Sequence, residues 1–299
     1  MKAGVASENG IEVRDVPQPR PKPTEVLVKV RAASLNRADL TTARGLPHGS
    51  HGGVGAPVGI DWAGEVVEAG AEVQGGFKPG DRVMCSGTGG YAEYAVSDWG
   101  RVNAMPAGMS FEQAATLPVA LATLHNALVT AGRLTAGERV MIQGASSGVG
   151  LMGLQIAKLK GASLVIGTST DDARRARLKE FGADLVVDML SGPVVAQTMK
   201  ATAVLGRIVN VGRLAGTKAE FDFDLHALRR IDYIGVTFRT RTLEEVREIT
   251  RRMHADLWDA VTAGKLRLPI DRRFPLDEAP AAQARMRANK HFGKIVLTM

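Results

Sequence analysis

The stretch VMIQGASSGVGLMGLQIAKLKGA, residues 140–162, joins an apolar strand, a turn of small residues and an apolar helix. No side chain in the turn, residues 144–150, is larger than valine. A strand that turns tightly into a helix presents backbone N–H groups and the positive end of the helix dipole, which together bind phosphate. Small residues let a pyrophosphate approach the backbone, and Gly150 lets helix and strand pack closely. The residues predicted to hold a dinucleotide phosphate are Ser146, Ser147, Gly148, Val149 and Gly150.

The match to the dinucleotide-binding pattern G-x-G-x-x-G is imperfect. The aligned residues are Ala145, Ser147 and Gly150, so small residues replace two glycines. A tight turn without a ligand would look similar. The flanking strand and helix, and a further apolar strand at 163–168, favour the binding site.

The end of the 163–168 strand bears on the choice of cofactor. An acidic residue there would hold the ribose of NAD. The sequence instead reads TSTDDARR from Thr168, which offers small hydroxyls and then Arg174 and Arg175. Charge-assisted bonds to a 2′-phosphate would favour NADPH. Asp171 and Asp172 argue against this unless they cap the next helix, and the arginines could instead form a solvated helix face.

The chain divides into two patterns. Up to about residue 118, short strands such as EVLVKVRAAS (25–34) alternate with Gly/Pro turns, which indicates a compact β-barrel-like domain. From 119 to 261, strands and helices alternate as in a parallel sheet covered on both faces. The expected strands are 139–143, 163–168, 185–188, 207–212 and 232–238, with helices at 147–160, 172–181 and 192–201.

The last part of the chain is expected to return to the first domain. Thr242 and Glu245 form a capping-box pair at the start of a long helix. Residues 262–299 then read as strand, helix and strand. The α/β domain would thus be inserted within the β domain.

Composition sets limits on function. The hydrophobic content of 45% and charged content of 23% are those of a globular protein. The single cysteine, Cys85, excludes an internal disulfide and a four-cysteine zinc site and is expected to be a buried free thiol. The net charge of +7 comes from scattered basic residues rather than a basic tail. It argues against nucleic-acid binding and fits an anionic small ligand.

We expect a cytoplasmic protein without a membrane span. The first residues, MKAGVASENG, contain neither an apolar signal core nor an arginine-rich presequence. The longest apolar run, AATLPVALATLHNALV, is interrupted by Pro118, His125 and Asn126.

Eight stretches resemble the medium-chain dehydrogenase/reductase superfamily, in particular its zinc-independent quinone oxidoreductase branch. They are AASLNRADLTTARG, PVGIDWAGEVVEAG, FKPGDRV, GGYAEYAV, LPVALATLHNAL, GASSGVG, GRIVNVG and HFGKIVL. The resemblance implies an α/β protein with a GroES-like substrate domain at 1–118 and 262–299 and a Rossmann dinucleotide-binding domain at 119–261. It also implies a cleft between the domains and a homodimer.

The resemblance also bears on metal binding. Zinc-dependent relatives carry a cysteine where this chain has Asn36, and a His-Glu pair where it has Ile60 and Asp61. Asparagine and isoleucine do not replace thiolate and imidazole as zinc ligands. The six histidines show no H-x-x-x-H pair, so no catalytic metal is expected.

The resemblance assigns cofactor-binding roles to several residues. Asn36 and Thr123 would touch the nicotinamide half, and Lys294 would reach the cofactor from the last strand. Ser169 and Arg174 would face the 2′-phosphate, and the backbone of Phe238 and Arg239 would pass near the carboxamide. The structural alternatives are Asn36 as a turn cap, Thr123 as a helix hydroxyl bonded to its own backbone, and Lys294 as a surface charge.

The sequence departs from the family pattern at two places. Pro47 stands where relatives often have an aromatic residue, so Tyr91 is the substitute phenolic donor unless it is a buried barrel tyrosine. The stretch GADLVVDMLSGPVVAQTM, 182–199, is compressed, because relatives have a further strand and helix there. We expect a five-stranded Rossmann sheet or the loss of an edge unit, close to the adenosine pocket.

The function expected is metal-independent, NADPH-dependent reduction of a quinone or an activated C=C bond of the enone type. Candidate catalytic residues are Asn36, Asp39, Arg44 and Tyr91, although Asp39 and Arg44 could form a structural ion pair. An enoyl-thioester reductase and a non-catalytic NADPH-binding sensor or structural protein are the alternatives.

Overall fold

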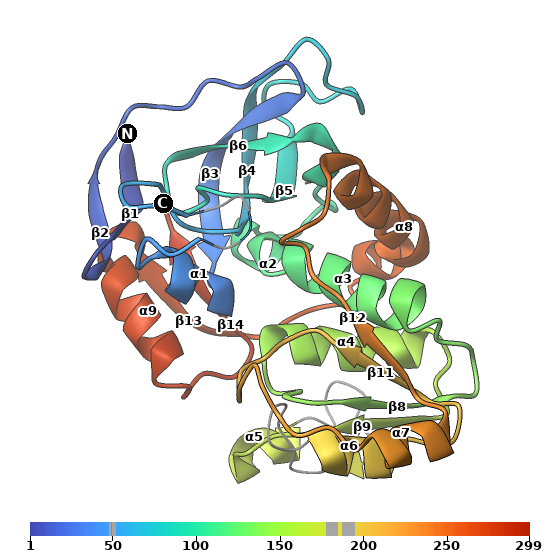
Figure 1. The fold of residues 1–299 in the computed structure, drawn as a ribbon. Coiled ribbons are helices and arrows are strands. Elements are labelled where there is room, and N and C mark those ends of the chain that lie inside the picture. The colour runs from blue at the N-terminus through green and yellow to red at the C-terminus, as the bar shows by residue number, and fades with distance from the viewer. Residues whose placement is uncertain (48, 50–51, 178–184, 187–194) are drawn as a thin grey trace. The chain divides into compact units, whose positions relative to one another are not determined.

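The computed structural model divides the chain into two compact units (Figure 1). It describes residues 1–47, 49, 52–177, 185–186 and 195–299. Unit 1 comprises Met1–Ala120 and Phe238–Met299, and unit 2 comprises Leu121–Thr237. The second unit is therefore inserted within the first along the chain.

Unit 1 is built mainly from strands. These are β1 (Lys2–Ser7), β2 (Gly10–Asp15), β3 (Glu25–Ser34), β4 (Asp61–Ala69), β5 (Arg82–Ser86), β6 (Tyr94–Asp98), β7 (Val102–Ala104), β13 (Ile270–Pro275) and β14 (Lys294–Thr298). Its helices are α1 (Arg37–Thr42), η1 (Trp99–Arg101), α2 (Phe111–Ala115), α8 (Leu243–Thr262), η4 (Leu276–Glu278) and α9 (Ala279–Arg287).

A seven-stranded sheet forms the body of unit 1, with the order β13-β14-β3-β4-β5-β7 and with β6 also paired to β3. The central strand β3 alternates as its sequence predicts, and Val26, Val28 and Val30 are all buried. Cys85 on β5 is a buried free thiol, as expected, and burial raises its pKa. This barrel-like packing of short strands agrees with the predicted fold class.

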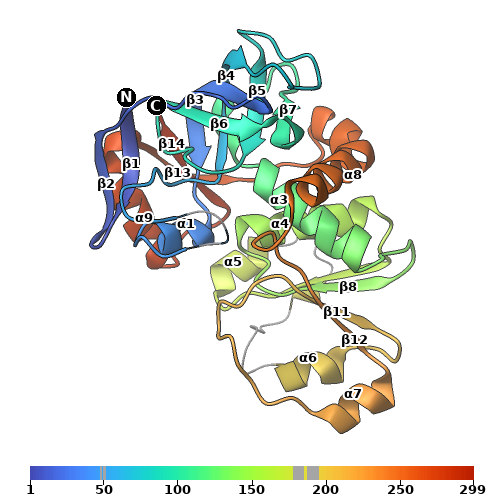
Figure 2. The ribbon, with the colours of Figure 1, turned by 45° about the horizontal axis from the view of Figure 1, so that its top comes forward.

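The end of the chain lies in the same sheet as its beginning. β14 pairs antiparallel with β3, with Val296 opposite Ser34, and parallel with β13. Figure 2 shows β13 and β14 beside β3, with α9 close to the β1–β2 hairpin. Strands distant in sequence therefore meet near the carboxyl end of β3.

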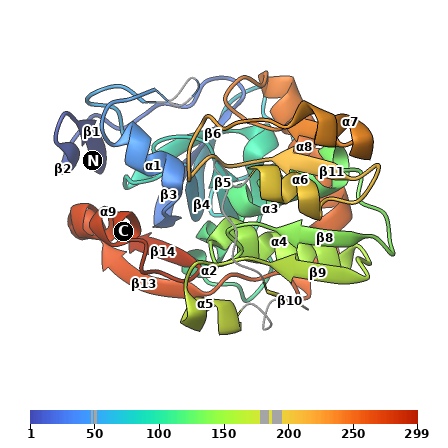
Figure 3. The same cartoon turned by 60° about the horizontal axis from the view of Figure 1, so that its bottom comes forward.

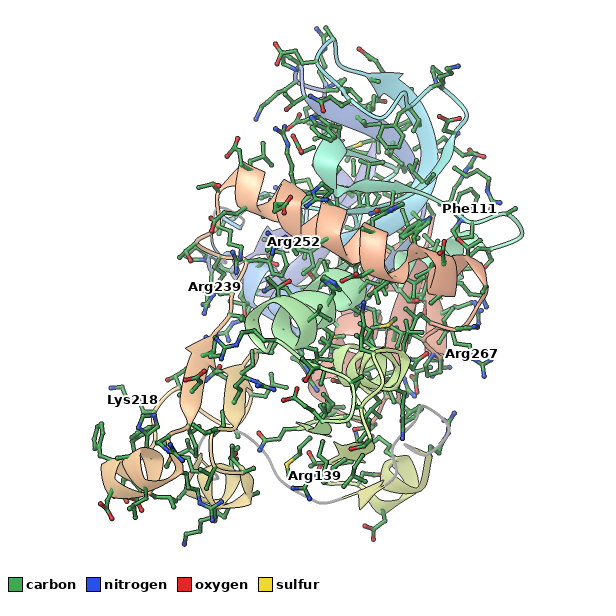
Figure 4. The ribbon with its side chains drawn as sticks, turned by 90° about the vertical axis from the view of Figure 1, so that its right-hand side faces the viewer. Phe111, Arg139, Lys218, Arg239, Arg252 and Arg267 are labelled. Carbon is green, nitrogen blue, oxygen red and sulfur yellow. The ribbon has the colours of Figure 1, made fainter. Side chains whose placement is uncertain are left out.

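The helix α8 belongs to unit 1, whereas the sequence assignment placed 238–261 in the Rossmann domain. Its start is the predicted capping box of Thr242 and Glu245. Arg247 donates to both carboxylate oxygens of Asp98 at 2.9 and 2.7 Å, and its guanidinium lies 4.7 Å from the centre of the Trp99 ring. These contacts attach α8 to η1, while the exposed Arg252 lies elsewhere on the helix (Figure 4).

Unit 2 alternates strands and helices. The strands are β8 (Arg139–Ile142), β9 (Leu164–Gly167), β10 (Leu185–Val186), β11 (Arg207–Asn210) and β12 (Asp232–Gly235). The helices are η2 (Asn126–Ala131), α4 (Gly148–Leu159), α5 (Asp172–Arg177), α6 (Val195–Ala201) and α7 (Phe223–Arg229). The helix α3 (Pro118–His125) crosses the boundary between the units.

All five strands expected in unit 2 are present, but they form two parallel ladders. One has the order β10-β9-β8 and the other pairs β11 with β12. Helix α4 packs on β8 and β9, and α6 and α7 lie beside β11 and β12 (Figure 3). Most of the compressed stretch, at 182–184 and 187–194, lies outside the described residues. Within the described residues, no backbone ladder joins β8 to β11.

One helical stretch, Phe111–Ala131, is long and apolar enough to cross a membrane by length and composition alone. Its mean hydropathy is 1.3, but 67% of the most apolar window is buried inside the protein. Buried helices of globular cores have the same composition.

Candidate functional site

A polar cluster forms in unit 1 where three strands meet. Asn36 follows β3 and caps α1, Asp61 begins β4, and Lys294 begins β14. Because β4 and β14 both pair with β3 near Ser34, these three positions come together. The fold therefore assembles the cluster from segments far apart in the sequence.

The three side chains are buried and bonded to one another. The Lys294 Nζ donates to Asn36 Oδ1 at 2.9 Å and to Asp61 Oδ2 at 3.0 Å. The Asn36 Nδ2 donates to Asp61 Oδ2 at 3.0 Å, and the Val119 amide donates to Asp61 Oδ1 at 2.9 Å. Lys294 is only 3% exposed, so it is not the surface charge considered as its alternative.

The cluster does not fit a zinc ion. The Lys294 ammonium lies where a cation would have to bind, and it already forms an ion pair with the Asp61 carboxylate. Asn36 offers an amide that is itself bonded to Lys294 and Asp61. Over the described part of the chain, no group of three or more His, Cys, Asp or Glu residues could hold a metal ion.

Asp39 and Tyr91 form a second buried pair next to this cluster. Both side chains are fully buried, and the Tyr91 hydroxyl donates to Asp39 Oδ2 at 2.7 Å. The Asn36 amide donates to the same oxygen at 2.7 Å. Burial raises the pKa of Asp39 to about 7, although Tyr91, Asn36 and Lys294 each lower it. Burial also raises the pKa of Tyr91 well above its usual value.

The other candidate residues of unit 1 lie apart from this pair. Arg44 is exposed whereas Asp39 is buried with other partners, so they do not form the ion pair considered above. Arg239 lies in the connection between β12 and α8 (Figure 4), preceded by the half-buried Phe238. Its backbone contacts the glycine-rich loop, because a Cβ on Gly49 would lie 2.8 Å from the Arg239 oxygen. Gly49 therefore permits this close approach.

In unit 2 the small-residue turn is fixed to the end of β9. The Gly144 amide donates to Thr168 Oγ1 at 2.9 Å, and the Ala145 amide donates to the Thr168 carbonyl at 2.8 Å. Ser147 caps α4, because its hydroxyl donates to the Gly144 carbonyl and accepts from the Gly150 amide. The turn thus has a defined shape without a ligand.

The turn also meets the two requirements of a phosphate cradle. A Cβ on Gly150 would lie 2.6 Å from Ala145 Cα, so only glycine permits this approach of helix and turn. The amides of Gly148 and Val149 begin α4 and have no carbonyl partner within the helix. The shape of the turn therefore fits a pyrophosphate, and its binding there stays a prediction.

The candidate 2′-phosphate residues lie next to this turn. The Ser169 hydroxyl donates to the Ser146 hydroxyl at 3.1 Å, and both residues are buried. Asp171 caps α5, as expected, by accepting from the Arg174 amide at 2.8 Å. Its carboxylate also lies 3.5 Å from Arg174 Nε, and the backbone hydrogen bond, followed by this charge, lowers the pKa of Asp171. Arg174 is thus restrained by a neighbouring carboxylate.

Thr123 lies on α3 and is half-buried. In the described structure its hydroxyl makes no hydrogen bond to the carbonyls of its own helix, which was its structural alternative.

Sequence reasoning missed two residues. Asp61 was considered only as a failed metal ligand, yet it joins Asn36, Lys294 and Val119. Thr168 was counted among possible phosphate donors, yet it fixes the turn to β9. Asp61 is the first residue of β4 and Thr168 directly follows β9, so the signal for both was a polar residue at one terminus of an apolar strand.

Two sequence families match the chain. Residues 22–107 match the alcohol dehydrogenase GroES-like domain, and residues 160–297 match a family described as zinc-binding dehydrogenase. The chain belongs to the medium-chain dehydrogenase/reductase superfamily of oxidoreductases. In this chain, the Asn36 and Asp61 side chains are both hydrogen-bonded to the buried Lys294 ammonium.

Individual relatives agree with this assignment. The chain is 29% identical to the quinone oxidoreductase of Homo sapiens, covering 95% of this chain and 92% of the relative. It is 28% identical to the highly reducing polyketide synthase easB of Emericella nidulans over 95% of this chain, but it spans only 12% of that protein. A probable oxidoreductase from Mycobacterium abscessus is 29% identical and has a TM-score of 0.84, covering 100% of this chain and 99% of that structure.

Proposed function

We propose that this protein is an NADPH-dependent oxidoreductase that reduces a quinone or an activated C=C bond without a metal. The observation that carries the proposal is the preformed turn Gly144–Gly150, whose leading amides are available to a pyrophosphate. The similarity to a quinone oxidoreductase along almost its whole length supports the substrate class.

The residues of the chain would bind and orient the cofactor. The amides of Gly148 and Val149 would bind the pyrophosphate. By the family resemblance, Asn36 and Lys294 are proposed to contact the cofactor. NADPH, when bound, supplies the hydride. The protein contributes orientation and fixed charge, so no acid–base pair of the hydrolase type is needed. Further cofactor contacts are proposed for Thr123 and for the backbone of Phe238 and Arg239. The exposed Arg44 is a proposed substrate contact.

A direct test measures NADPH and NADH oxidation by absorbance with a panel of quinones, enones and enoyl thioesters. Oxidation of NADPH with quinones or enones supports the proposal. Gly150→Ala forces a Cβ against Ala145 and is expected to weaken cofactor binding about tenfold or more. Gly212→Ala is the matched control, because a Cβ there meets nothing within 4 Å. Equal cofactor affinity in both variants would contradict the site.

We propose that the preference for NADPH depends on Arg174. The Asp171 carboxylate partly neutralises its guanidinium. Asp171→Asn keeps the helix cap but removes the competing charge, so the ratio of NADPH to NADH affinity is expected to rise a few-fold. Asp222→Asn, an exposed cap of α7 in the same unit, is the control. An unchanged ratio would show that Arg174 does not face the 2′-phosphate.

The similarity to polyketide synthases supports a second candidate, enoyl-thioester reduction. Faster NADPH oxidation with an enoyl thioester than with any quinone or enone would favour it. Tight NADPH binding without oxidation across the panel would instead favour a sensor or structural protein.

We also propose a homodimer formed through β12. Among the described residues this strand pairs only with β11, so no backbone partner is seen at its second edge. Several large apolar side chains in residues 204–233, the stretch that leads into β12, are exposed, including Phe223 and Tyr233. Sedimentation at several concentrations tests this, and a monomer at all of them would contradict it.

A further inference from the structure

In the buried cluster of unit 1, two carboxyl groups lie beside a single ammonium group. Asp39 and Asp61 are each 0% exposed, and Lys294 is the cation beside them. Asp61 accepts from Lys294, Asn36 and the Val119 amide, which is the bonding pattern of an ionised carboxylate. Lys294 and Asp61 neutralise each other, so an ionised Asp39 would add an uncompensated buried charge.

The two oxygens of Asp39 have different surroundings. Oδ2 accepts from the Tyr91 hydroxyl and from the Asn36 amide, both at 2.7 Å. Oδ1 is buried and has no hydrogen-bond partner among the described residues. A buried acceptor without a donor is costly, whereas a carboxyl group that carries a proton on that oxygen is neutral. The burial of Asp39 and its unpartnered oxygen therefore favour the neutral, protonated carboxyl group over the carboxylate.

We propose that Asp39 is a positioning residue that holds one exchangeable proton for this buried cluster. Through the Asn36 backbone amide, it keeps the Asn36 side chain in place between Lys294 and Asp61. This rests on the proposed function only in that Asn36 is taken to contact the cofactor. Loss of the proton puts a second negative charge beside Asn36 and draws Lys294 away from Asp61 by charge attraction.

The titration of Asp39 supports this assignment. Burial and, less strongly, the charge of Asp61 raise the pKa of Asp39, while Tyr91, Asn36 and Lys294 lower it, and the net result is a pKa of about 7. The groups around Asp39 come from several elements: Asn36 before α1, Tyr91 before β6, Asp61 on β4, Lys294 on β14, and the neutral amide of Gln283 on α9. The proton is thus exchanged near neutral pH.

The test is the pH profile of kcat/KM for NADPH oxidation in wild type and three variants. We expect the wild-type value to fall about tenfold between about pH 6 and about pH 8. Asp39→Asn, which is neutral at every pH, should remove this fall. Tyr91→Phe removes a donor that stabilises the carboxylate, so it should move the fall to higher pH. Tyr94→Phe on β6 is the control and should keep the wild-type profile.

An infrared measurement tests the proton without requiring activity. The wild type should show a protonated-carboxyl band at about pH 6 that disappears by about pH 8. Asp39→Asn should lack that band, and Tyr91→Phe should keep it to higher pH. Absence of the band in folded wild type, or its persistence in Asp39→Asn, overturns the proposal. A wild-type pH profile of kcat/KM in Asp39→Asn also overturns the proposal.

These outcomes separate the two proposals. If no substrate is reduced, the proposed function fails, while the infrared band still decides whether Asp39 holds the proton. If reduction occurs and Asp39→Asn keeps the alkaline fall, the reductase stands and Asp39 loses its role.

Discussion

The sheets of the two units are built differently. In unit 1, β3 has ten residues and pairs with β14, β4 and β6, so its valines are covered. In unit 2, the strands have two to four residues and form two ladders. Unit 1 can bury an ion cluster inside its sheet, whereas the ion pairs of unit 2 are partly exposed.

Side chains bridge the two ladders of unit 2. Arg207 at the start of β11 donates to Glu138, just before β8, and Gln143 donates to Thr198 on α6 at 2.8 Å. A strand bonded to both β8 and β11 would close the sheet, and none of the described residues forms one. The comparison with unit 1 indicates that a continuous sheet excludes water from buried charges, whereas the charged side chains beside the divided sheet of unit 2 stay hydrated.

The largest effect is expected from breaking the buried ion pair of unit 1. Lys294→Met leaves the Asp61 carboxylate uncompensated and should cost about 3–5 kcal/mol of stability. Tryptophan fluorescence during urea unfolding measures it, because Trp62, Trp99 and Trp258 all lie in unit 1.

The double variant Lys294→Met with Asp61→Asn is the control for that change. It removes both charges and should recover most of the lost stability. If the single variant is as stable as wild type, Lys294 and Asp61 are hydrated, and the contrast between the two units fails.

The next effect is the pH dependence of stability through Asp39. Its pKa is raised by burial to about 7 from an unfolded value of 3.8, so the folded state binds the proton more tightly. Stability should therefore fall as pH rises from about 4 to about 7, by roughly 4 kcal/mol, and then level off. Asp39→Asn should lack this contribution in urea unfolding, while the exposed Asp15→Asn should retain it. Parallel curves for all three proteins would show that Asp39 is ionised throughout.

Local patterns predicted the elements of both units. The alternation in β3, the capping box of α8 and the turn before α4 depend on neighbours in sequence, so they could be predicted. The attachment of α8 could not, because Arg247 and Asp98 are 149 positions apart. The division of the parallel sheet likewise depends on which distant strands pair, and apolar strands carry no label for their partners.

The same distinction holds for the candidate site. The phosphate turn is local and was predicted from seven consecutive residues. Asn36 and Lys294 were chosen through resemblance, but their meeting at Asp61 joins residues 25 and 233 positions away from it. Burial of Tyr91 and Asp39 follows from strand packing around them, which single residues do not reveal.

A smaller effect is expected from the bridge between the ladders. Arg207 and Glu138 are partly exposed, so their pairing should contribute only about 1 kcal/mol. A double-mutant cycle of Arg207→Met and Glu138→Gln measures the coupling through hydrogen exchange of the β8 and β11 amides. A coupling of several kcal/mol would mean that the Arg207–Glu138 pair is shielded from water, like the Lys294–Asp61 pair of unit 1.

The smallest effect is expected on the exposed apolar face of unit 2. Phe223 is 76% exposed, so Phe223→Ser should change stability by less than about 0.5 kcal/mol in a dilute monomer. Leu154→Ala on α4, where the side chain is fully buried, should cost about 2–5 kcal/mol in the same hydrogen-exchange measurement. A large loss for Phe223→Ser that grows with protein concentration would show that a second copy covers this face. The open ladder would then be completed by assembly, and the contrast with unit 1 would hold only for the isolated chain.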